Sequence, residues 1–358
     1  MNEDFSKLHR ELVAEGLFEP SKTFVVYKGL ELLFFLVAGV YLTLWSSSWL
    51  LYGVGILSFA LFMGRCGWYN HDGSHHSLTG NPDIDRFIGF VSFGKQNSTI
   101  LWQFSHEFAQ LTGTIGVTVS IRTELTLSFM QFPGLGDGMS ASWWLEHHNK
   151  HHGMPQRMEH DTNLETLPLL AFSPKVVKEK AVGKSWLVQN QAVLFLIDCY
   201  VIILWWKAYH LYYAYKHKNW VEVVSMVAHF TLVSYYFGFF NYALAGGFAA
   251  VYMILNISLS HTHTPVAEEP THWLEYGTTH TIDIDGSWWC DWWMGYLNYQ
   301  IEHHLFPTLP PFNLPKIQDR VRNLAEKHSL PFVSVPYTEA IKITLKNLAD
   351  VAEELAHD

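Results

Sequence analysis

Two pairs of long apolar stretches limit this chain to folds that can place them in a membrane. The first pair is 29–45 and 49–63, and the second is 220–240 and 243–258. At a rise of ~1.5 Å per residue, each stretch comes close to the ~20 residues that cross a hydrocarbon core of ~30 Å. The sequence therefore predicts four transmembrane helices in two hairpins, at about 29–64 and 220–260.

The turns of the predicted hairpins carry no charge. Ser46, Ser47 and Ser48 separate the first pair, and the second pair turns around Asn241 and Tyr242. Two adjacent glycines, Gly246 and Gly247, are small enough to allow close helix packing in the second hairpin.

A further apolar stretch, 187–206, carries polar residues that include Gln189 and Asp198. We interpret it as an interfacial helix, because lysines such as Lys207 and Lys216 then stay on the same side as the other cations, as the positive-inside rule requires. Both termini, residues 65–184 and everything after Ser260 are then cytosolic. The predicted fold is an all-α membrane protein with a cytosolic helical cap.

Composition excludes several other classes. The chain has 358 residues, of which 49% are hydrophobic and 16% charged, so it can bury a large core. Its net charge is −10 and its cations form no basic block, so we expect no nucleic-acid partner. Three widely spaced cysteines favour neither a disulfide framework nor a cysteine-based zinc site.

Histidine is the residue type that points to chemistry, because the 21 histidines are clustered. Three clusters have helical spacing: His71 and His75; His148, His151 and His152; and His303 and His304, with Gln300 in the position that would begin a second i, i+3, i+4 set. Such spacing directs several imidazoles from one helix to one point. His261 follows the last apolar stretch on the same side of the membrane.

About eight neutral nitrogens with hardly any carboxylate or thiolate are too many for one ion, so two metal ions are expected. Zinc is normally closed by four ligands, whereas a redox-active pair needs open positions, and we therefore favour iron. His76 and His147 lie beside the expected ligands but off their shared face, so we expect them to support the ligands or to lie at the surface.

At these residues the sequence resembles the membrane fatty acid desaturases. The segment 298–307, Asn-Tyr-Gln-Ile-Glu-His-His-Leu-Phe-Pro, is similar to the front-end (delta-5/delta-6-like) subgroup, in which glutamine replaces the first histidine of the third cluster. The resemblance implies a single desaturase domain over 1–358 with two iron ions. The implied ligands are His71, His75, His148, His151, His152, His261, His303 and His304, with Gln300 as a ninth or water-mediated ligand.

The resemblance also implies a reaction: O₂-dependent insertion of a double bond on the carboxyl side of an existing one. The substrate would be a fatty acyl-CoA or an acyl lipid of the membrane. Many front-end desaturases carry a fused cytochrome b5 domain with a His-Pro-Gly-Gly motif, which this chain lacks. Electrons are therefore expected from a separate cytochrome b5 and its reductase, and the endoplasmic reticulum is the expected membrane.

Asp72 and Glu302 stand next to proposed ligands in the sequence. Carboxylates commonly accept a hydrogen bond from the second ring nitrogen of a metal-bound histidine, so these two are expected to orient imidazoles.

Other functions remain open at this point. A sphingolipid desaturase or a fatty acyl hydroxylase could use the same di-iron core. An inactive homologue is another alternative. A non-enzymatic membrane metal-binding protein is disfavoured because the apolar stretches hold few charged residues, among them Glu31 and Glu222.

One segment departs from the family pattern. Residues 95–133 read as about 39 extra residues, rich in Thr, Ser and β-branched side chains, between the first and second histidine clusters. We interpret this segment as a retained intron or a gene-model error, and therefore as foreign to the family, with an added surface loop as the alternative.

Deleting residues 95–133 should preserve or restore desaturase activity if the segment is foreign. Product analysis of cells that express the two forms tests this. An active full-length chain beside an inactive deletion variant would show instead that the segment belongs to the working protein.

Overall fold

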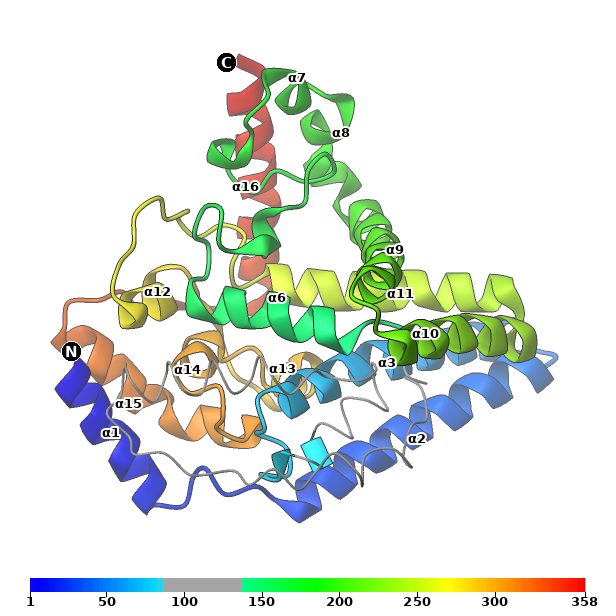
Figure 1. Ribbon diagram of the computed structural model, residues 1–358, viewed down its shortest axis with the longest axis horizontal. Helices are drawn as coiled ribbons and strands as arrows, with labels where there is room; N and C mark the ends of the chain where they lie inside the picture. The colour runs from blue at the N-terminus through cyan, green and yellow to red at the C-terminus, as the bar shows by residue number, and fades with distance from the viewer. Residues whose placement is uncertain (83, 86–136, 358) are drawn as a thin grey trace.

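The computed structural model describes residues 1–82, 84–85 and 137–357, and these residues are mainly helical, with two short parallel β-pairings (Figure 1). The predicted all-α class is confirmed. The segment 95–133 lies outside the described residues. The elements beyond those discussed below are η2 (Thr162–Leu164), η3 (Pro174–Val176), α7 (Lys180–Gly183), α8 (Trp186–Gln189), α13 (Trp288–Met294) and η5 (Pro311–Asn313).

The first hairpin forms as predicted. Helix α2 (Lys22–Trp45) and helix α3 (Trp49–Ser74) run side by side along nearly their whole length (Figure 1). The Ser48 side chain accepts a hydrogen bond from the Leu51 amide and so caps α3 where the chain turns. Helix α3 continues eleven residues beyond the predicted span and carries His71 in its last turn, so the first histidine cluster is fixed directly to the membrane hairpin.

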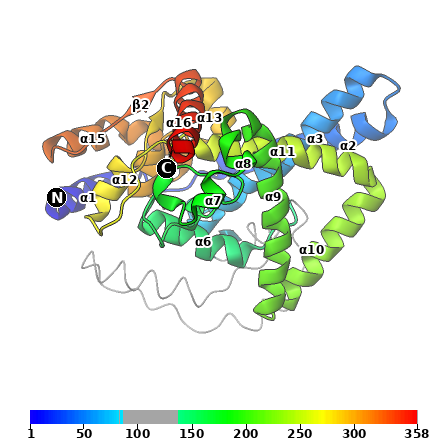
Figure 2. The same ribbon diagram turned by 90° about the horizontal axis from the view of Figure 1, so that it is seen from above.

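The second predicted hairpin bends earlier than expected. Helix α10 (Trp220–Val233) passes through a π-helical turn, η4 (Ser234–Gly238), into α11 (Phe239–Ser258). The bend falls at Gly238, whose φ of +93° is open mainly to glycine, so the prediction of a turn around Asn241 and Tyr242 was wrong. Figure 2 shows α10 and α11 diverging from this bend as an open V.

The glycines of α11 serve other contacts than those predicted. Gly247 lies against the ring of Tyr200 in α9 (Gln191–Lys216), and Gly246 faces Met63 in α3. Helix α11 therefore packs against α3 and α9 rather than back along α10.

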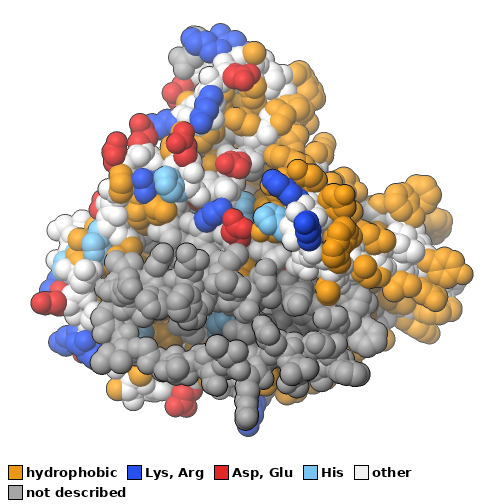
Figure 3. Space-filling model, in the orientation of Figure 1, with side chains coloured by type: hydrophobic (Ala, Val, Ile, Leu, Met, Phe, Trp, Pro, Cys, Tyr) orange, Lys and Arg blue, Asp and Glu red, His pale blue; other side chains and the backbone are white. Residues whose placement is uncertain are grey.

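In the part of the chain that the structure describes, four apolar segments are long enough to cross a membrane: α2, α3, α9 and the continuous unit from Trp220 to Ser258. The number agrees with the prediction, but the set differs, because α9 is one unbroken apolar helix of 26 residues. Large apolar side chains are exposed on these helices, and Figure 3 shows hydrophobic side chains gathered on their side of the molecule. The side of the membrane on which the termini lie, and the interfacial placement of α9, stay predictions.

Charged residues of the apolar helices are paired inside the protein. Arg65 of α3 and Glu31 of α2 form a buried ion pair at 3.1 Å. Lys207 of α9 pairs with Asp137 at 2.8 Å. Lys207 is therefore a buried cation held by Asp137, and the side of the membrane on which it lies stays a prediction.

The cap is built around α14 (Gln300–Leu305). Its apolar residues pack with α1 (Asn2–Ala14), α12 (Trp273–Thr279) and α15 (Leu314–Lys327) in one core, in which Phe5 stacks on Phe306 with ring centroids 4.9 Å apart. Strand β1 (Asp283–Ile284) pairs in parallel with β2 (Ser334–Val335). Helix α16 (Tyr337–His357) packs on α9 and joins the cap to the membrane helices.

The seam between α2 and α3 depends on glycine. A Cβ at Gly55 would lie 2.6 Å from the Thr43 backbone nitrogen, whereas a Cβ at Gly53, two residues earlier in the same helix, would meet nothing within 4 Å. Gly55→Ala should therefore lower the free energy of unfolding by about 1–3 kcal/mol through overpacking. A lower melting temperature of the detergent-solubilised protein would show this loss.

Gly53→Ala is the matched control, and it should leave stability unchanged or raise it by up to ~1 kcal/mol through helix propensity. Equal melting temperatures for the two variants would contradict close packing at this seam.

Candidate metal centre

The eight predicted histidines come from four segments that are far apart in the sequence. His71 lies in the last turn of α3, and His75 is the residue that caps its end. Helix α6 (Ala141–Gly153) carries the second cluster and α14 the third, while His261 lies in the turn just after α11. The fold brings all eight together.

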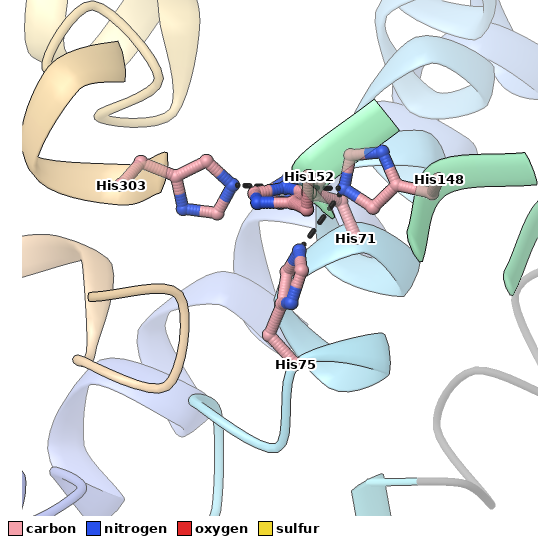
Figure 4. A group of neighbouring side chains, drawn as sticks. All are labelled: His71, His75, His148, His152 and His303. Atoms are coloured by element: carbon pink, nitrogen blue, oxygen red, sulfur yellow. Dashed lines mark hydrogen bonds between the residues drawn. The ribbon is translucent and has the colours of Figure 1, made fainter. Parts of the chain in front are cut away.

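The histidines form two adjoining groups. The five-histidine group is His71, His75, His148, His152 and His303 (Figure 4), and the three-histidine group is His151, His261 and His304. Within each group the potential ligand nitrogens lie within 4.8 Å of one another. Because α6 and α14 each supply histidines to both groups, the two groups share a wall, where His152 stacks on His304 with ring centroids 4.4 Å apart.

The spacing in the five-histidine group fits ligands of one ion. The Nε2 atom of His148 lies 3.0 Å from Nε2 of His75 and 3.1 Å from Nε2 of His152. Nε2 of His303 lies 3.1 Å from Nε2 of His152. An imidazole nitrogen lies about 2.1 Å from a metal ion such as zinc, so two nitrogens at right angles on one ion are about 3.0 Å apart.

These imidazoles are held in the form that can bind metal. Burial, reinforced by the neighbouring histidines, holds the pKa well below its usual value for His75, His148, His152, His303 and His304. Burial also lowers the pKa of His261 to about 3. Neutral rings offer nitrogen lone pairs, and the donor set therefore fits a pair of borderline metal ions.

The three-histidine group has its imidazoles oriented from outside. His261 Nδ1 lies 3.2 Å from the backbone oxygen of His280, and His151 Nδ1 lies 2.9 Å from Asp161 Oδ2. Each contact occupies Nδ1 and leaves Nε2 for a metal. Both ring nitrogens of His304 are buried without a hydrogen-bond partner among the described residues, as expected for a ligand position.

Asp161 is a functional residue that the sequence reasoning missed. It is buried, and its carboxylate accepts hydrogen bonds from the amides of Gln156 and Asn163 as well as contacting His151. Burial acts to raise the pKa of Asp161, but His151 and these hydrogen bonds outweigh it and lower the pKa to about 2. The available signal was an aspartate soon after the second cluster, but ten residues separate it from His151, so helical spacing could not connect them.

The carboxylates predicted to orient imidazoles have different surroundings. Asp72 Oδ1 lies 3.2 Å from His71 Nδ1, as expected for an orienting group. Glu302 makes no contact with an imidazole; its buried carboxyl lies beside that of Asp283 instead. Burial, with Asp283 beside it, raises the pKa of Glu302 well above its usual value.

His147 and His76 are not members of either group. His147 stacks on Trp143 with ring centroids 4.2 Å apart, and its Nδ1 and Nε2 lie 2.6 Å from Thr162 Oγ1 and 2.9 Å from Asn163 Oδ1. Both of its nitrogens are therefore committed to hydrogen bonds. His76 has a left-handed backbone, with φ of +56°, just past the end of α3.

Gln300 is buried as the first residue of α14, one turn before His303 and His304. This position is compatible with the ninth ligand that the sequence suggested. Its ligation, like that of the histidines, stays a prediction.

Buried carboxylates fix the helices that carry the ligands. Glu222 of α10 accepts hydrogen bonds from the Ser140 hydroxyl at 2.6 Å and the Ser142 amide at 3.0 Å, so it anchors the start of α6. Asp283 of β1 accepts a hydrogen bond from the Ile301 amide at 2.9 Å in the first turn of α14, and Gln318 of α15 holds its other oxygen. These hydrogen bonds fix the first turns of both helices and so help to hold the histidines of α6 and α14 in position.

An apolar pocket adjoins the three-histidine group. It lies between α9, α11 and the loop after α6. Its lining consists of His151 and His261, the apolar residues Leu164, Phe172, Ile202, Trp206, Ile254 and Ile257, and the polar residues Gln156, Asp161, Asn163, Thr166, Ser258 and Thr262. An apolar segment of a substrate could reach the histidines through such a pocket.

Adjacent histidines of α6 should behave differently. His148→Ala should reduce the metal content of the purified protein, because His148 contacts two other imidazoles. His147→Ala should retain the metal. It should lose only about 1–3 kcal/mol of stability, because the hydrogen-bond partners of His147 are left unsatisfied. Metal per chain by elemental analysis and the melting temperature test this. Equal metal loss in both variants would contradict the assignment of His147.

Comparison with known proteins agrees with this arrangement. The sequence model of the fatty acid desaturase family matches residues 123–336. The chain is 36% identical to the acyl-lipid (8-3)-desaturase of Rebecca salina, over 98% of this chain and 75% of that protein. It is 34% identical to the acyl-lipid (8-3)-desaturase of a Thraustochytrium species, over 100% of this chain and 76% of that protein. It is 28% identical to the delta(8)-fatty-acid desaturase of Euglena gracilis, over 97% of this chain and 78% of that protein. The chain belongs to the fatty acid desaturase family and, within it, to the front-end subgroup.

Proposed function

We propose that this protein desaturates polyunsaturated acyl chains of membrane lipids on the carboxyl side of an existing double bond. The observation that carries the proposal is the meeting of eight imidazoles, seven of them buried and His152 partly so, in two adjoining groups beside an apolar pocket. An acyl-lipid substrate, rather than an acyl-CoA, is supported by the names of the two relatives that share 34–36% identity with the chain.

The reaction removes two hydrogens from adjacent methylenes, and these two hydrogens together with O₂, two electrons and two protons become two molecules of water. No side chain is a strong enough base or nucleophile to attack an unactivated methylene. Two bound iron ions would supply the oxidising chemistry, with O₂ as co-substrate. We propose His71, His75, His148, His152 and His303 for one ion, and His151, His261 and His304, with Gln300 as a further candidate, for the other.

The protein's own residues would prepare the site for this chemistry. Burial holds the pKa of His148 and His304 well below its usual value, so these two rings would offer a nitrogen lone pair to a metal. Phe172, Ile202 and Ile254 line an apolar pocket in which an acyl chain would displace water. Exclusion of water protects an oxidising centre from side reactions.

The buried ion pairs of the apolar helices do not favour a transport function. Arg65, Glu31 and Lys207 are held in ion pairs, and Glu222 is held by Ser140 and Ser142. Charged groups that form a transport path would face a water-filled cavity rather than one another.

The electron donor and the membrane belong to the same proposal. We propose a separate cytochrome b5 with its reductase as the electron source, and the endoplasmic reticulum as the location, with both termini and the metal centre on the cytosolic side. The family relationship supports both.

The test is expression in yeast cells that are fed linoleic, α-linolenic and twenty-carbon polyunsaturated acids one at a time. Gas chromatography should reveal a new acid with one added double bond on the carboxyl side. A hydroxylated acid or a desaturated sphingoid base would instead identify one of the two related reactions.

His303→Ala is the control variant, because His303 contacts His152 and lies in the five-histidine group. It should enter the membrane in normal amounts and make no product. Wild-type turnover by this variant would contradict the proposed ligand set.

A further inference from the structure

The loop that follows α6 wraps back over the helix. We name residues 156–163 the strap. It is tied to the segment after His261 by two backbone hydrogen bonds, from the Met158 amide to the Ala267 oxygen at 3.0 Å and from the Ala267 amide to the Gln156 oxygen at 2.9 Å. The strap therefore connects the segments that carry two members of the three-histidine group.

The strap holds His151 through Asp161. The carboxylate lies 2.9 Å from His151 Nδ1, and it is itself fixed by the strap's own amides at Gln156 and Asn163, at 2.7 and 3.0 Å. Asp161 is only 3% exposed, so water does not compete for these contacts. A carboxylate on Nδ1 sets the tautomer and raises the basicity of Nε2, the nitrogen left for the metal.

The strap holds the backbone at His261 through Gln156. The Gln156 side-chain amide donates a hydrogen bond to the backbone oxygen of His261. Gln156 has φ of +58°, a left-handed conformation that residues other than Gly, Asn and Asp adopt rarely. This conformation directs its amide to Asp161 and its side chain to His261 at the same time, and strained backbone of this kind is concentrated at functional sites.

The hydrogen bonds of the strap reach the two groups unequally. Among the described residues they contact His151, the His261 backbone and His147, which belongs to neither group. The five-histidine group is held by Asp72 and by contacts among its own imidazoles. The three-histidine group also has fewer imidazoles, so its affinity for a metal depends more on how each one is oriented.

We propose that Asp161 and Gln156 are positioning residues that give the three-histidine site its metal affinity, so that the two sites fill independently. The proposal rests on the di-iron function proposed above and adds the element that controls one of the two ions.

The test uses the full chain, purified in detergent, stripped of metal and titrated anaerobically with Fe(II). Wild-type protein should bind two iron ions per chain. Asp161→Asn should bind the first ion normally and the second with about 10–100-fold lower affinity, the range expected on loss of a group that orients a metal ligand. Gln156→Leu, which keeps the backbone amide to Asp161, should weaken the second ion less.

Glu165→Gln is the matched control. It also changes a carboxylate to an amide, two residues beyond the strap, but at an exposed position. It should bind two ions with wild-type affinity. The melting temperature of the metal-free protein shows whether each variant is folded. If Asp161→Asn fails to fold, the test rests on Gln156→Leu: weaker binding of the second ion supports the proposal, and unchanged binding contradicts it.

Double variants assign the weakened site. Adding Asp161→Asn to His261→Ala should change iron binding no further, because the same site is already lost. Adding it to His75→Ala should weaken binding of the remaining ion by the same factor of about 10–100. Two ions bound by Asp161→Asn with unchanged affinity, or equal weakening of both ions, would overturn the proposal while leaving the desaturase function intact. A wild-type chain that binds two ions but makes no product would instead refute the proposed function and leave the role of the strap standing.

Discussion

The structure depends on gathering eight imidazoles, most of them buried, in one place. Their nitrogens face one another at about 3 Å, and several, such as those of His304, have no hydrogen-bond partner among the described residues. Buried polar groups without partners cost free energy, and a metal ion is the partner that can satisfy several lone pairs at once. The surrounding helices must therefore hold the imidazoles in place against this cost.

Buried carboxylates from separate segments supply much of that support. Glu222 anchors the start of α6, Asp283 anchors the start of α14, and Asp161 holds the far end of the second histidine cluster. Each accepts backbone amides as well as side-chain groups. In a low-dielectric interior such charge-assisted hydrogen bonds are strong. Removing one partner leaves the other buried and unsatisfied, which costs its full desolvation free energy.

The membrane part and the metal part are coupled through helix ends. Helix α3 begins within the glycine-packed hairpin and ends at His75, and α11 ends three residues before His261. The positions of these histidines are thus set by packing between apolar helices. The ion pair of Arg65 with Glu31 ties the same hairpin together, and Trp292 of α13 donates a hydrogen bond to Glu31, which links the hairpin to the cap.

The sequence by itself determined the helical class, the first membrane hairpin and the eight histidines, because helical periodicity and apolar length are local properties. It did not determine how the histidines divide into five and three, that His147 turns toward Thr162, that Gly238 makes the bend, or that Asp161 rather than Glu302 contacts an imidazole. Periodicity shows which residues share a face of one helix. Only the packing of segments far apart in the sequence decides what that face meets.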